Sequence, residues 1–304
     1  MKVIIPVAGY GTRLKPHTDK IQKTILPVAG KPVLDHILAP LFEHNIRSVI
    51  FIVGHLKGQV ADHMNKYHGN FSFVEQTKRL GLGHAVLQGL QDTEDPVLVQ
   101  LGDSIFNVDY SDLCSRRTNQ IVVEEVDDPS RFGIVEVVED KIVGFYEKDP
   151  DPPGNLAISG LYYFINESQL KGALENLIDN DMKTKNEYQL TDALQIMLDQ
   201  GSIFNCYPSN EYIDVGVPED FLKANKTLLM PHHDDVSGVK ITDPVFIGEG
   251  CNIKNSSIGP YVTIMNNCNV KNCQIIDSIV LDGAQLKDLS INHQIIGGNG
   301  SEYC

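Results

Sequence analysis

A short segment near the N-terminus combines glycines with basic side chains. Gly9 and Gly11 follow an apolar, strand-like run, and Arg13 and Lys23 come after them. Positions 1–31 carry six Lys or Arg against one acid, a local charge of +5 in a chain whose net charge is −15. Glycine lets backbone N–H groups approach an anion closely, Arg offers forked donors to phosphate oxygens, and Lys adds a mobile point charge. The segment therefore indicates a binding site for a phosphorylated ligand, with a solvated basic loop as the alternative.

Two common phosphate-binding motifs do not fit this segment. A dinucleotide-binding fingerprint requires a third glycine three positions after Gly11, where the chain has Leu14, and Pro16 follows soon after. A Walker-type loop requires Ser or Thr after its Gly-Lys pair, whereas Pro32 follows Lys31. The spacing excludes both motifs and leaves the ligand unnamed.

The composition limits the class of protein. The chain has 304 residues, 42% of them apolar and 21% charged, which is typical of a globular protein with a substantial core. A net charge of −15 argues against general binding to nucleic acid, which requires a basic surface. The longest apolar stretches have the length of strands and the N-terminus lacks a secretory signal, so we expect a cytoplasmic protein without membrane segments. Six cysteines without a C-x-x-C pair favour reduced thiols over a zinc site.

The first part of the chain alternates strand-like and helix-like segments. Branched residues predict the strands, and apolar residues at helical spacing predict the helices between them. The predicted strands are 2–8, 48–53, 71–76 and 96–102, and the predicted helices are 31–45, 57–66 and 83–91. This order predicts a Rossmann-like α/β fold with a mixed, mostly parallel sheet and helices on both faces.

After residue 120 the pattern changes to longer, paired strands. Residues 120–126 and 157–166 are predicted strands, and residues 132–148 are predicted to form a hairpin that turns at Glu139-Asp140. Helical spacing returns at 168–179, 190–199 and 218–229. We therefore expect one α/β domain over residues 1–230.

The C-terminal part carries a repeat of branched residues at intervals of six. The series is Ile241, Ile247, Ile253 and, after a slip of one residue, Ile258, Ile264, Val270 and Ile276. Such a repeat is typical of a left-handed parallel β-helix, expected here over residues 239–304 as about three coils of roughly 18 residues. An irregular β-rich tail is the alternative. Residues 231–238 are predicted to be a polar linker, and their two histidines and two aspartates are not expected to bind metal.

The order of motifs along the chain resembles one family. The segment GTRLKPHTDKIQKTILPVAGKP at residues 11–32 is similar to the signature of the sugar-1-phosphate nucleotidyltransferases. Further matching segments follow in the family's order: EQTKRLGLGHAV, LGDS, FGIVEV, FYEK, NLAISGLYYF, NEYQLTDAL and YIDVGVPEDF. The resemblance covers nearly all of residues 1–229, is closest to glucose-1-phosphate uridylyl- and thymidylyltransferases, and extends to the β-helix tail, which is familiar in this family.

The resemblance implies a reaction in which two anions meet. An oxygen of a sugar 1-phosphate attacks the α-phosphorus of a nucleoside triphosphate, and pyrophosphate leaves. Neutralising and positioning the phosphates is then the main catalytic problem, and Mg²⁺ held by carboxylates is the implied cofactor. By the resemblance its ligands are Asp103 and Asp214, each at a position where a predicted strand meets a turn.

The resemblance also assigns the residues that bind the nucleotide. Arg13 would contact the departing pyrophosphate and Lys23 the α-phosphate, so that Arg13, Lys23 and Asp103 are the implied catalytic residues. Gln76 and Gly81 would hydrogen-bond the edge of the base, the first through its amide and the second through its backbone. The triphosphate would be held by Gly9, Gly11, Thr12 and Arg13.

The sugar phosphate is assigned to residues farther along the chain. Glu147 matches the acceptor of a sugar hydroxyl and Lys148 the donor to the sugar phosphate; the pocket would be completed by Gly133, Asn155 and Gly160. Two positions depart from the family's pattern. Gln22 stands where a proline usually precedes the nucleotide-binding lysine, so we expect a looser loop there, and Asp149 replaces the proline that usually follows the sugar-binding lysine.

The sequence does not decide between two nucleotide substrates, UTP and dTTP. The stretch GLGHAV resembles uridylyltransferases, whereas YIDVGVPEDF resembles the thymidylyltransferase branch, so both UTP and dTTP fit, and glucose 1-phosphate is the expected sugar. The alternative is a non-catalytic subunit of the same fold that senses a nucleotide or a sugar phosphate. An acyltransferase activity in the β-helix is a further alternative, for which His293 is an isolated candidate. We also expect a homo-oligomer, formed through the flat faces of the β-helix.

Overall fold

A computed structural model describes residues 1–209, 211–231, 236, 238–297 and 302–303 of the chain. It consists of two compact units. The first comprises Met1–Gly9 and Ile37–Tyr212, and the second comprises Tyr10–His36 and Ile213–Cys304. Most of the predicted linker, including its histidines and aspartates, lies outside the described residues. The domain boundaries at residues 230 and 238 therefore stay a prediction.

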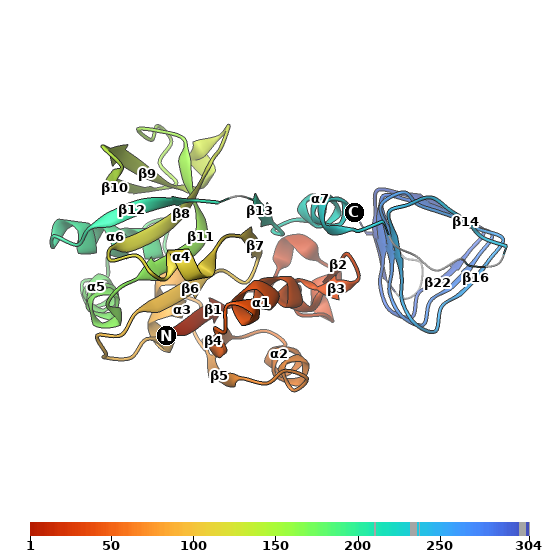
Figure 1. The fold of residues 1–304 in the computed structure, drawn as a ribbon, viewed down its shortest axis with the longest axis horizontal. Helices are drawn as coiled ribbons and strands as arrows, with labels where there is room; N and C mark the ends of the chain where they lie inside the picture. Colours follow the sequence, from red (N-terminus) through yellow and green to blue (C-terminus); the bar gives the residue numbers. More distant parts are fainter. Residues whose placement is uncertain (210, 232–235, 237, 298–301, 304) are drawn as a thin grey trace. The chain divides into compact units, whose positions relative to one another are not determined.

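The first unit is built on a nine-stranded mixed sheet (Figure 1). Its first four strands are parallel to one another, and the other five are antiparallel to their neighbours except for the parallel pair β8–β12. β11 also pairs with β9, so the last five strands close into a ring. In spatial order the strands are β5 (Asn70–Glu75), β4 (Ser48–Val53), β1 (Lys2–Pro6), β6 (Val97–Gln100), β11 (Leu156–Phe164), β8 (Asn119–Glu125), β12 (Phe204–Pro208), β10 (Lys141–Glu147) and β9 (Gly133–Val138).

Both faces of the sheet are covered near β1. Neighbouring residues of a strand point to opposite faces, and Val3, Ile4 and Ile5 are all completely buried. α3 contacts β1 and β4, and it packs with α5 and α6. The helices with residues in this unit are α1 (Val33–Glu43, which begins in the second unit), α2 (Lys57–Met64), α3 (Leu82–Gly89), α4 (Tyr110–Leu113), α5 (Glu167–Asp179) and α6 (Leu190–Asp199). The predicted α/β fold with a mixed sheet is confirmed.

The hairpin β9–β10 turns where the sequence predicts it. Glu139 and Asp140 have φ angles of 49° and 63°, which is the conformation of both central residues in the two-residue turn that suits a twisted hairpin. The sequence pattern does not predict β12, which lies inside the sheet between β8 and β10, or β7 (Ser104–Asn107).

The second unit contains a parallel β-helix, as predicted. Figure 1 shows its stacked coils, whose short strands form three parallel sheets. The first sheet is β14 (Lys240–Ile241), β17 (Ser257–Ile258), β20 (Gln274–Ile276) and β23 (Ser290–Asn292). The second is β15 (Val245–Ile247), β18 (Val262–Ile264), β21 (Ser278–Val280) and β24 (Ile295–Ile296), with β25 (Glu302–Tyr303) antiparallel at its edge. The third is β16 (Asn252–Lys254), β19 (Asn269–Lys271) and β22 (Gln285–Lys287).

The coils are shorter than the sequence analysis predicts. Ile258 stacks on Ile275, and Val280 stacks on Ile296. In both pairs the stacked positions are closer along the chain than three steps of six would place them, so each of these coils contains at least one step of five. The prediction that Ile276 continues the series is wrong, because Ile275 is the residue that is completely buried and Ile276 is only half-buried.

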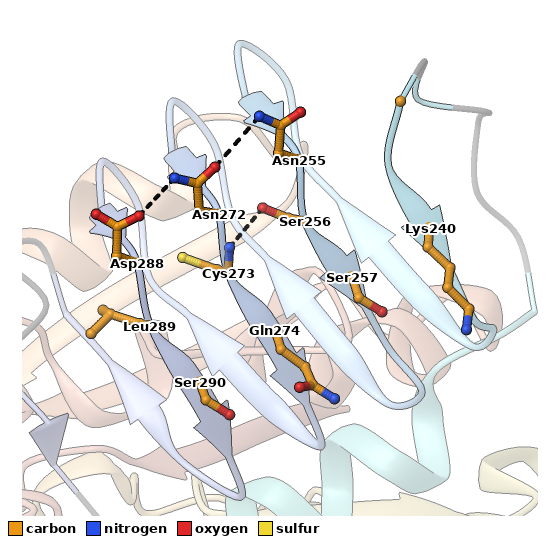
Figure 2. A pocket seen from close by; sticks show the side chains of 11 residues that line it. Lys240, Asn255, Ser256, Ser257, Asn272, Cys273, Gln274, Asp288, Leu289 and Ser290 are labelled. Carbon is orange, nitrogen blue, oxygen red and sulfur yellow. Dashed lines mark hydrogen bonds between the residues drawn. The ribbon is translucent and has the colours of Figure 1, made fainter.

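Polar side chains form a ladder along one corner of the coils. Asn255, Asn272 and Asp288 occupy equivalent turns, with φ angles of 49°, 55° and 57°. Asn255 donates to Asn272 at 3.5 Å, and Asn272 donates to Asp288 at 2.6 Å (Figure 2). Asn and Asp tolerate this left-handed backbone better than other non-glycine residues, which explains the asparagine-rich intervals of the repeat.

A buried asparagine joins the parts of the second unit. Asn225 of α7 (Pro218–Leu228) is completely buried. Its Oδ1 accepts hydrogen bonds from the backbone N–H of Ala29 at 2.9 Å and from the hydroxyl of Thr263 at 2.6 Å, and its Nδ2 donates to the carbonyl of Tyr261 at 3.1 Å. The N-terminal basic segment, α7 and the β-helix are therefore fixed as one packed body, which also holds the short strands β2 (Pro27–Val28) and β3 (Lys31–Pro32).

Within the described ranges, no helix is both long and apolar enough to cross a membrane.

Candidate active site

The glycine turn of the basic segment is held by a threonine. Gly11 has a left-handed backbone with φ of +61°, and its carbonyl accepts a hydrogen bond of 2.8 Å from the hydroxyl of Thr18. A methyl group on Gly11 would lie 2.8 Å from Cγ2 of Thr18 and 3.4 Å from Cβ of Lys23, whereas one on Gly9 would meet no atom within 4 Å. Thr12 begins the short 3₁₀ turn η1 (Thr12–Leu14) directly after Gly11. The left-handed backbone of Gly11 therefore determines the turn of the loop and lets it pack against Lys23.

We expect Gly11→Ala to lower both stability and activity. A left-handed non-glycine residue costs about 1–2 kcal/mol, and the added methyl also displaces Thr18, so the free energy of unfolding should fall by at least that amount. Gly9→Ala is the matched control, because its methyl enters open space and the φ angle of Gly9 lies outside the left-handed region. Urea denaturation measures the difference. Equal stability of the two variants would contradict the role of Gly11.

Gln22 fixes the start of the turn that carries Lys23, where the sequence analysis expected a looser loop. Gln22 is 1% exposed, and its Oε1 accepts hydrogen bonds of 2.6 Å from both the backbone N–H and the hydroxyl of Thr24. This interaction caps the 3₁₀ turn η3 (Lys23–Ile25). The expectation of a looser loop is wrong, because a buried side-chain cap supplies the restraint that proline supplies in the family's pattern.

Arg13 and Asp214 converge on Gly216 in the second unit. A side-chain carbon at position 216 would lie 3.2 Å from a guanidinium nitrogen of Arg13 and 3.2 and 3.3 Å from the carboxylate oxygens of Asp214. Asp214 is the last residue of β13 (Glu211–Asp214), and Arg13 is exposed in η1. Glycine at position 216 leaves room for a positive and a negative group side by side, which suits a phosphate and its counter-ion.

Asp103 lies in the turn between β6 and β7 in the first unit, where it is half-buried. Nearby, the backbone N–H of Leu101 donates to the carbonyl of Gly160 at 2.9 Å. Gly160 has φ of +101°, and a methyl group on it would lie 2.7 Å from the side chain of Leu101, so only glycine fits. Burial raises the pKa of the Tyr162 phenol, and the carboxylates of Glu147 and Asp103 raise it further. These two acids therefore share one neighbourhood.

The predicted sugar pocket centres on Glu147. One of its carboxylate oxygens accepts a hydrogen bond of 2.7 Å from the hydroxyl of Thr191, and the other lies 3.1 Å from Nζ of Lys148. A methyl group on Gly133 would come within 3.0 Å of the Thr191 hydroxyl and 3.1 Å of Glu147. Asn155 is exposed, and its backbone carbonyl accepts from the N–H of Val126. Thr191 was not predicted, although it lies in the matching segment NEYQLTDAL.

We expect Thr191→Val to weaken the binding of the sugar phosphate. Thr191 is 5% exposed, and its hydroxyl restrains the carboxylate of Glu147. One hydrogen bond to a charged group contributes about 1.5–3 kcal/mol, so KM for the sugar phosphate should rise at least about tenfold, with a smaller change in KM for the nucleotide. Steady-state kinetics with each substrate varied in turn measure this. Thr227→Val, which removes an exposed hydroxyl bonded to the carbonyl of Lys223, is the control, and equal effects of both variants would contradict the assignment.

The predicted base-binding residues form a small cluster in the first unit. Gln76 directly follows β5 and is 6% exposed. Its Nε2 lies 3.2 Å from the carbonyl of Gly81 and 3.0 Å from Nδ1 of His84. Gly81 precedes α3, and a methyl group on it would lie 2.6 Å from the carbonyl of Tyr188. His84 was not singled out from the sequence.

The predicted residues thus fall into two sets, one in each unit. The second unit brings together Gly11, Lys23, Arg13 and Asp214, and Thr12 lies in the same turn. The first unit holds Gly9, Asp103 and the clusters around Gln76 and Glu147. No group of three or more His, Cys, Asp or Glu that could hold a metal ion occurs among the residues with described positions. Asp103 and Asp214 nevertheless offer carboxylate oxygens, the donor type that Mg²⁺ prefers, so their chemistry fits the predicted ion.

The isolated histidine of the β-helix is engaged on both sides. Nδ1 of His293 lies 2.9 Å from the carboxylate of Asp277, and its Nε2 lies 3.0 Å from both carboxylate oxygens of Glu219. Hydrogen bonds to Asp277 and then to Glu219 raise the pKa of His293. Because both ring nitrogens are occupied, His293 is suited to linking α7 to the coils rather than to acting as a base.

Comparison with known proteins identifies the family to which this chain is similar. Residues 2–230 match the model of a protein family described as "Nucleotidyl transferase". The chain is 32% identical, over 333 aligned positions, to "Bifunctional protein GlmU" of Methanococcus maripaludis, with all of this chain and 79% of the relative covered. It is 29% identical to "Glucose-1-phosphate thymidylyltransferase" of Streptomyces antibioticus, with 98% and 92% covered. A solved structure, "UDP-glucose pyrophosphorylase from acinetobacter baumanii", matches with a TM-score of 0.64 and 26% identity over 76% of this chain and 94% of that one.

Proposed function

Because the chain belongs to the nucleotidyl transferase family, we propose that it joins UTP or dTTP to a sugar 1-phosphate, with glucose 1-phosphate as the sugar. The products would be the nucleoside diphosphate sugar and pyrophosphate. One relative is named as a thymidylyltransferase and one solved structure as a UDP-glucose pyrophosphorylase, and these names support both choices. The observation that carries the proposal is the turn at Gly11. It places Arg13, in η1, and Lys23 on one short segment, which hydrogen bonds of Thr18 and Gln22 hold in place.

Charge neutralisation is the proposed role of this segment. The guanidinium of Arg13 makes no ion pair with another described residue and would stabilise the charge that develops on the departing pyrophosphate. Lys23 would bind the α-phosphate, and backbone N–H groups near Gly9 and Gly11 would bind the remaining phosphate oxygens. Bound Mg²⁺, held by Asp103 and Asp214, would supply additional neutralisation of the triphosphate.

The attacking substrate is proposed to bind in the first unit. Glu147, held by Thr191, would accept a hydrogen bond from a sugar hydroxyl, and Lys148 would hold the phosphate of the sugar. Lys23 would bind a phosphate of the nucleotide and Lys148 the phosphate of the sugar, so that binding itself would reduce the repulsion between the two anionic substrates. We also propose that the flat faces of the β-helix mediate self-association, which light scattering of the purified protein measures.

One experiment tests the proposal against its alternative. The purified chain is incubated with Mg²⁺, glucose 1-phosphate and, in turn, UTP, dTTP, ATP, CTP or GTP, and pyrophosphate is measured. We expect release with UTP or dTTP. Nucleotide binding without pyrophosphate in any reaction would instead support a sensing subunit.

A further inference from the structure

The amide of Gln76 has both of its donor hydrogens directed at acceptors inside the protein. Nε2 carries two hydrogens, and its two neighbours are the carbonyl oxygen of Gly81 at 3.2 Å and Nδ1 of His84 at 3.0 Å. A backbone carbonyl can only accept a hydrogen bond. A flipped amide would place Oε1 against this carbonyl, where neither oxygen can donate, so the observed orientation is the favourable one.

His84 can accept this hydrogen bond only when its Nδ1 is unprotonated. Burial lowers the pKa of His84, and the positive charge of Lys78 lowers it further. Near neutral pH the ring is therefore uncharged, and with its proton on Nε2 it leaves Nδ1 as an acceptor. The environment of His84 thus favours the state that holds the amide of Gln76.

The remaining groups of this cluster define a hydrogen-bonding edge. With its donors occupied, Gln76 presents only Oε1, which is an acceptor. The backbone N–H of Gly81 has no partner in the described part of the chain and is a donor. An acceptor beside a donor complements the imide edge of uracil or thymine, in which N3–H donates and a ring carbonyl accepts. Cytosine presents the opposite pattern, because its N3 accepts and its amino group donates.

We propose that His84 is a positioning residue that locks the amide of Gln76 and thereby makes the site select an imide base over cytosine. This inference rests on the proposed function, in which Gln76 and Gly81 contact the base. His84 acts through Gln76 and does not itself touch the nucleotide. A buried polar group left without a partner by the wrong base is an effective source of discrimination.

The test compares two substitutions of His84. His84→Leu introduces an apolar side chain of similar length and removes the acceptor. His84→Asn restores an acceptor, because its Oδ1 can take the place of Nδ1. The kcat/KM values for UTP and CTP, or for dTTP and dCTP if the wild type prefers deoxynucleotides, are measured with saturating glucose 1-phosphate and Mg²⁺. We expect His84→Leu to reduce the preference for the imide base at least about tenfold, mainly through KM of the nucleotide. His84→Asn should recover most of that preference.

The outcomes separate this inference from the proposed function. If the wild type turns over UTP or dTTP and His84→Leu keeps its full preference, the inference is wrong and the function stands. If the wild type releases no pyrophosphate with any nucleotide, the proposed function itself fails. A measurement on the wild type covers the case in which His84→Leu does not fold: the side-chain NH₂ protons of Gln76, identified by their loss in Gln76→Met, should exchange slowly with solvent. Rapid exchange would contradict the proposal that His84 holds the amide of Gln76 in place.

Discussion

Asp103→Asn should lower the rate of pyrophosphate release about a thousandfold while leaving the melting temperature within about 2 °C of the wild type. The amide of asparagine has nearly the shape of the carboxylate but lacks its negative charge. Because Asp103 is a half-buried turn residue, the fold should tolerate this substitution. A divalent ion at the transferring phosphate contributes several kcal/mol of transition-state stabilisation, and about 4 kcal/mol corresponds to three orders of magnitude in rate. Initial rates across a titration of Mg²⁺ measure the effect.

Two comparisons sharpen this prediction. Asp214→Asn should show a loss of the same order, because both carboxylates are assigned to one ion, and high Mg²⁺ should rescue each variant only in part. Asp179→Asn removes an exposed carboxylate at the end of α5 and should change nothing. Full activity of Asp103→Asn would refute the metal assignment, whereas an equal loss in Asp179→Asn would point to a general effect of charge.

The regular part of the fold follows from local patterns. The predicted strands and helices between residues 2 and 102 match β1, β4, β5, β6 and α1 to α3 to within a few residues, because branched residues in strands and apolar residues at helical spacing are local signals. β12 was missed for the same reason. Its sequence, FNCYP, includes Asn and Pro, and its strand conformation depends on pairing with β8, which is distant in the sequence.

The grouping of segments into units depends on contacts that no periodicity reveals. The hydrogen bonds of Asn225 join positions 29, 261 and 263 to α7, and a single polar residue within a helix gives no sign of such partners. The repeat of the β-helix was visible because it recurs, but its shorter steps shifted the buried position from Ile276 to Ile275. The six-residue repeat thus identifies the β-helix but not every residue of its core.

In the candidate site, too, some residues can be recognised from the sequence and others cannot. The sequence points to glycines and charged residues as candidates because their chemistry is distinctive at short spacing. Gln22, Thr191 and His84 were missed or misjudged as supporting residues, since each acts by holding a neighbour in place. Such roles depend on a separation of about 3 Å between a side chain and one particular polar group, and residue type alone does not predict them.

Glu167→Ala should be the most destabilising of the substitutions considered, with a loss of about 3–5 kcal/mol in the free energy of unfolding. Glu167 is completely buried at the start of α5, and its Oε1 lies 2.7 Å from Nζ of Lys2. The same carboxylate accepts hydrogen bonds from the backbone N–H of Gln91 at 2.5 Å and from the hydroxyl of Thr93 at 3.0 Å. Removing it leaves the ammonium of Lys2, on the first strand of the sheet, and two further donors without their acceptor.

The matched control lies on the same helix. Glu175 pairs with Lys171 at 3.4 Å and is half-exposed, so Glu175→Ala should cost no more than about 0.5 kcal/mol. Urea denaturation of both variants, with a linear-extrapolation slope equal to that of the wild type, gives the comparison. Glu167→Gln should fall between them, because the amide can still accept from Thr93 or Gln91 but cannot neutralise Lys2. If Glu167→Ala and Glu175→Ala were equally stable, the buried pair would contribute nothing to holding α5 against the end of β1, and the sheet would have to be anchored there by apolar packing alone.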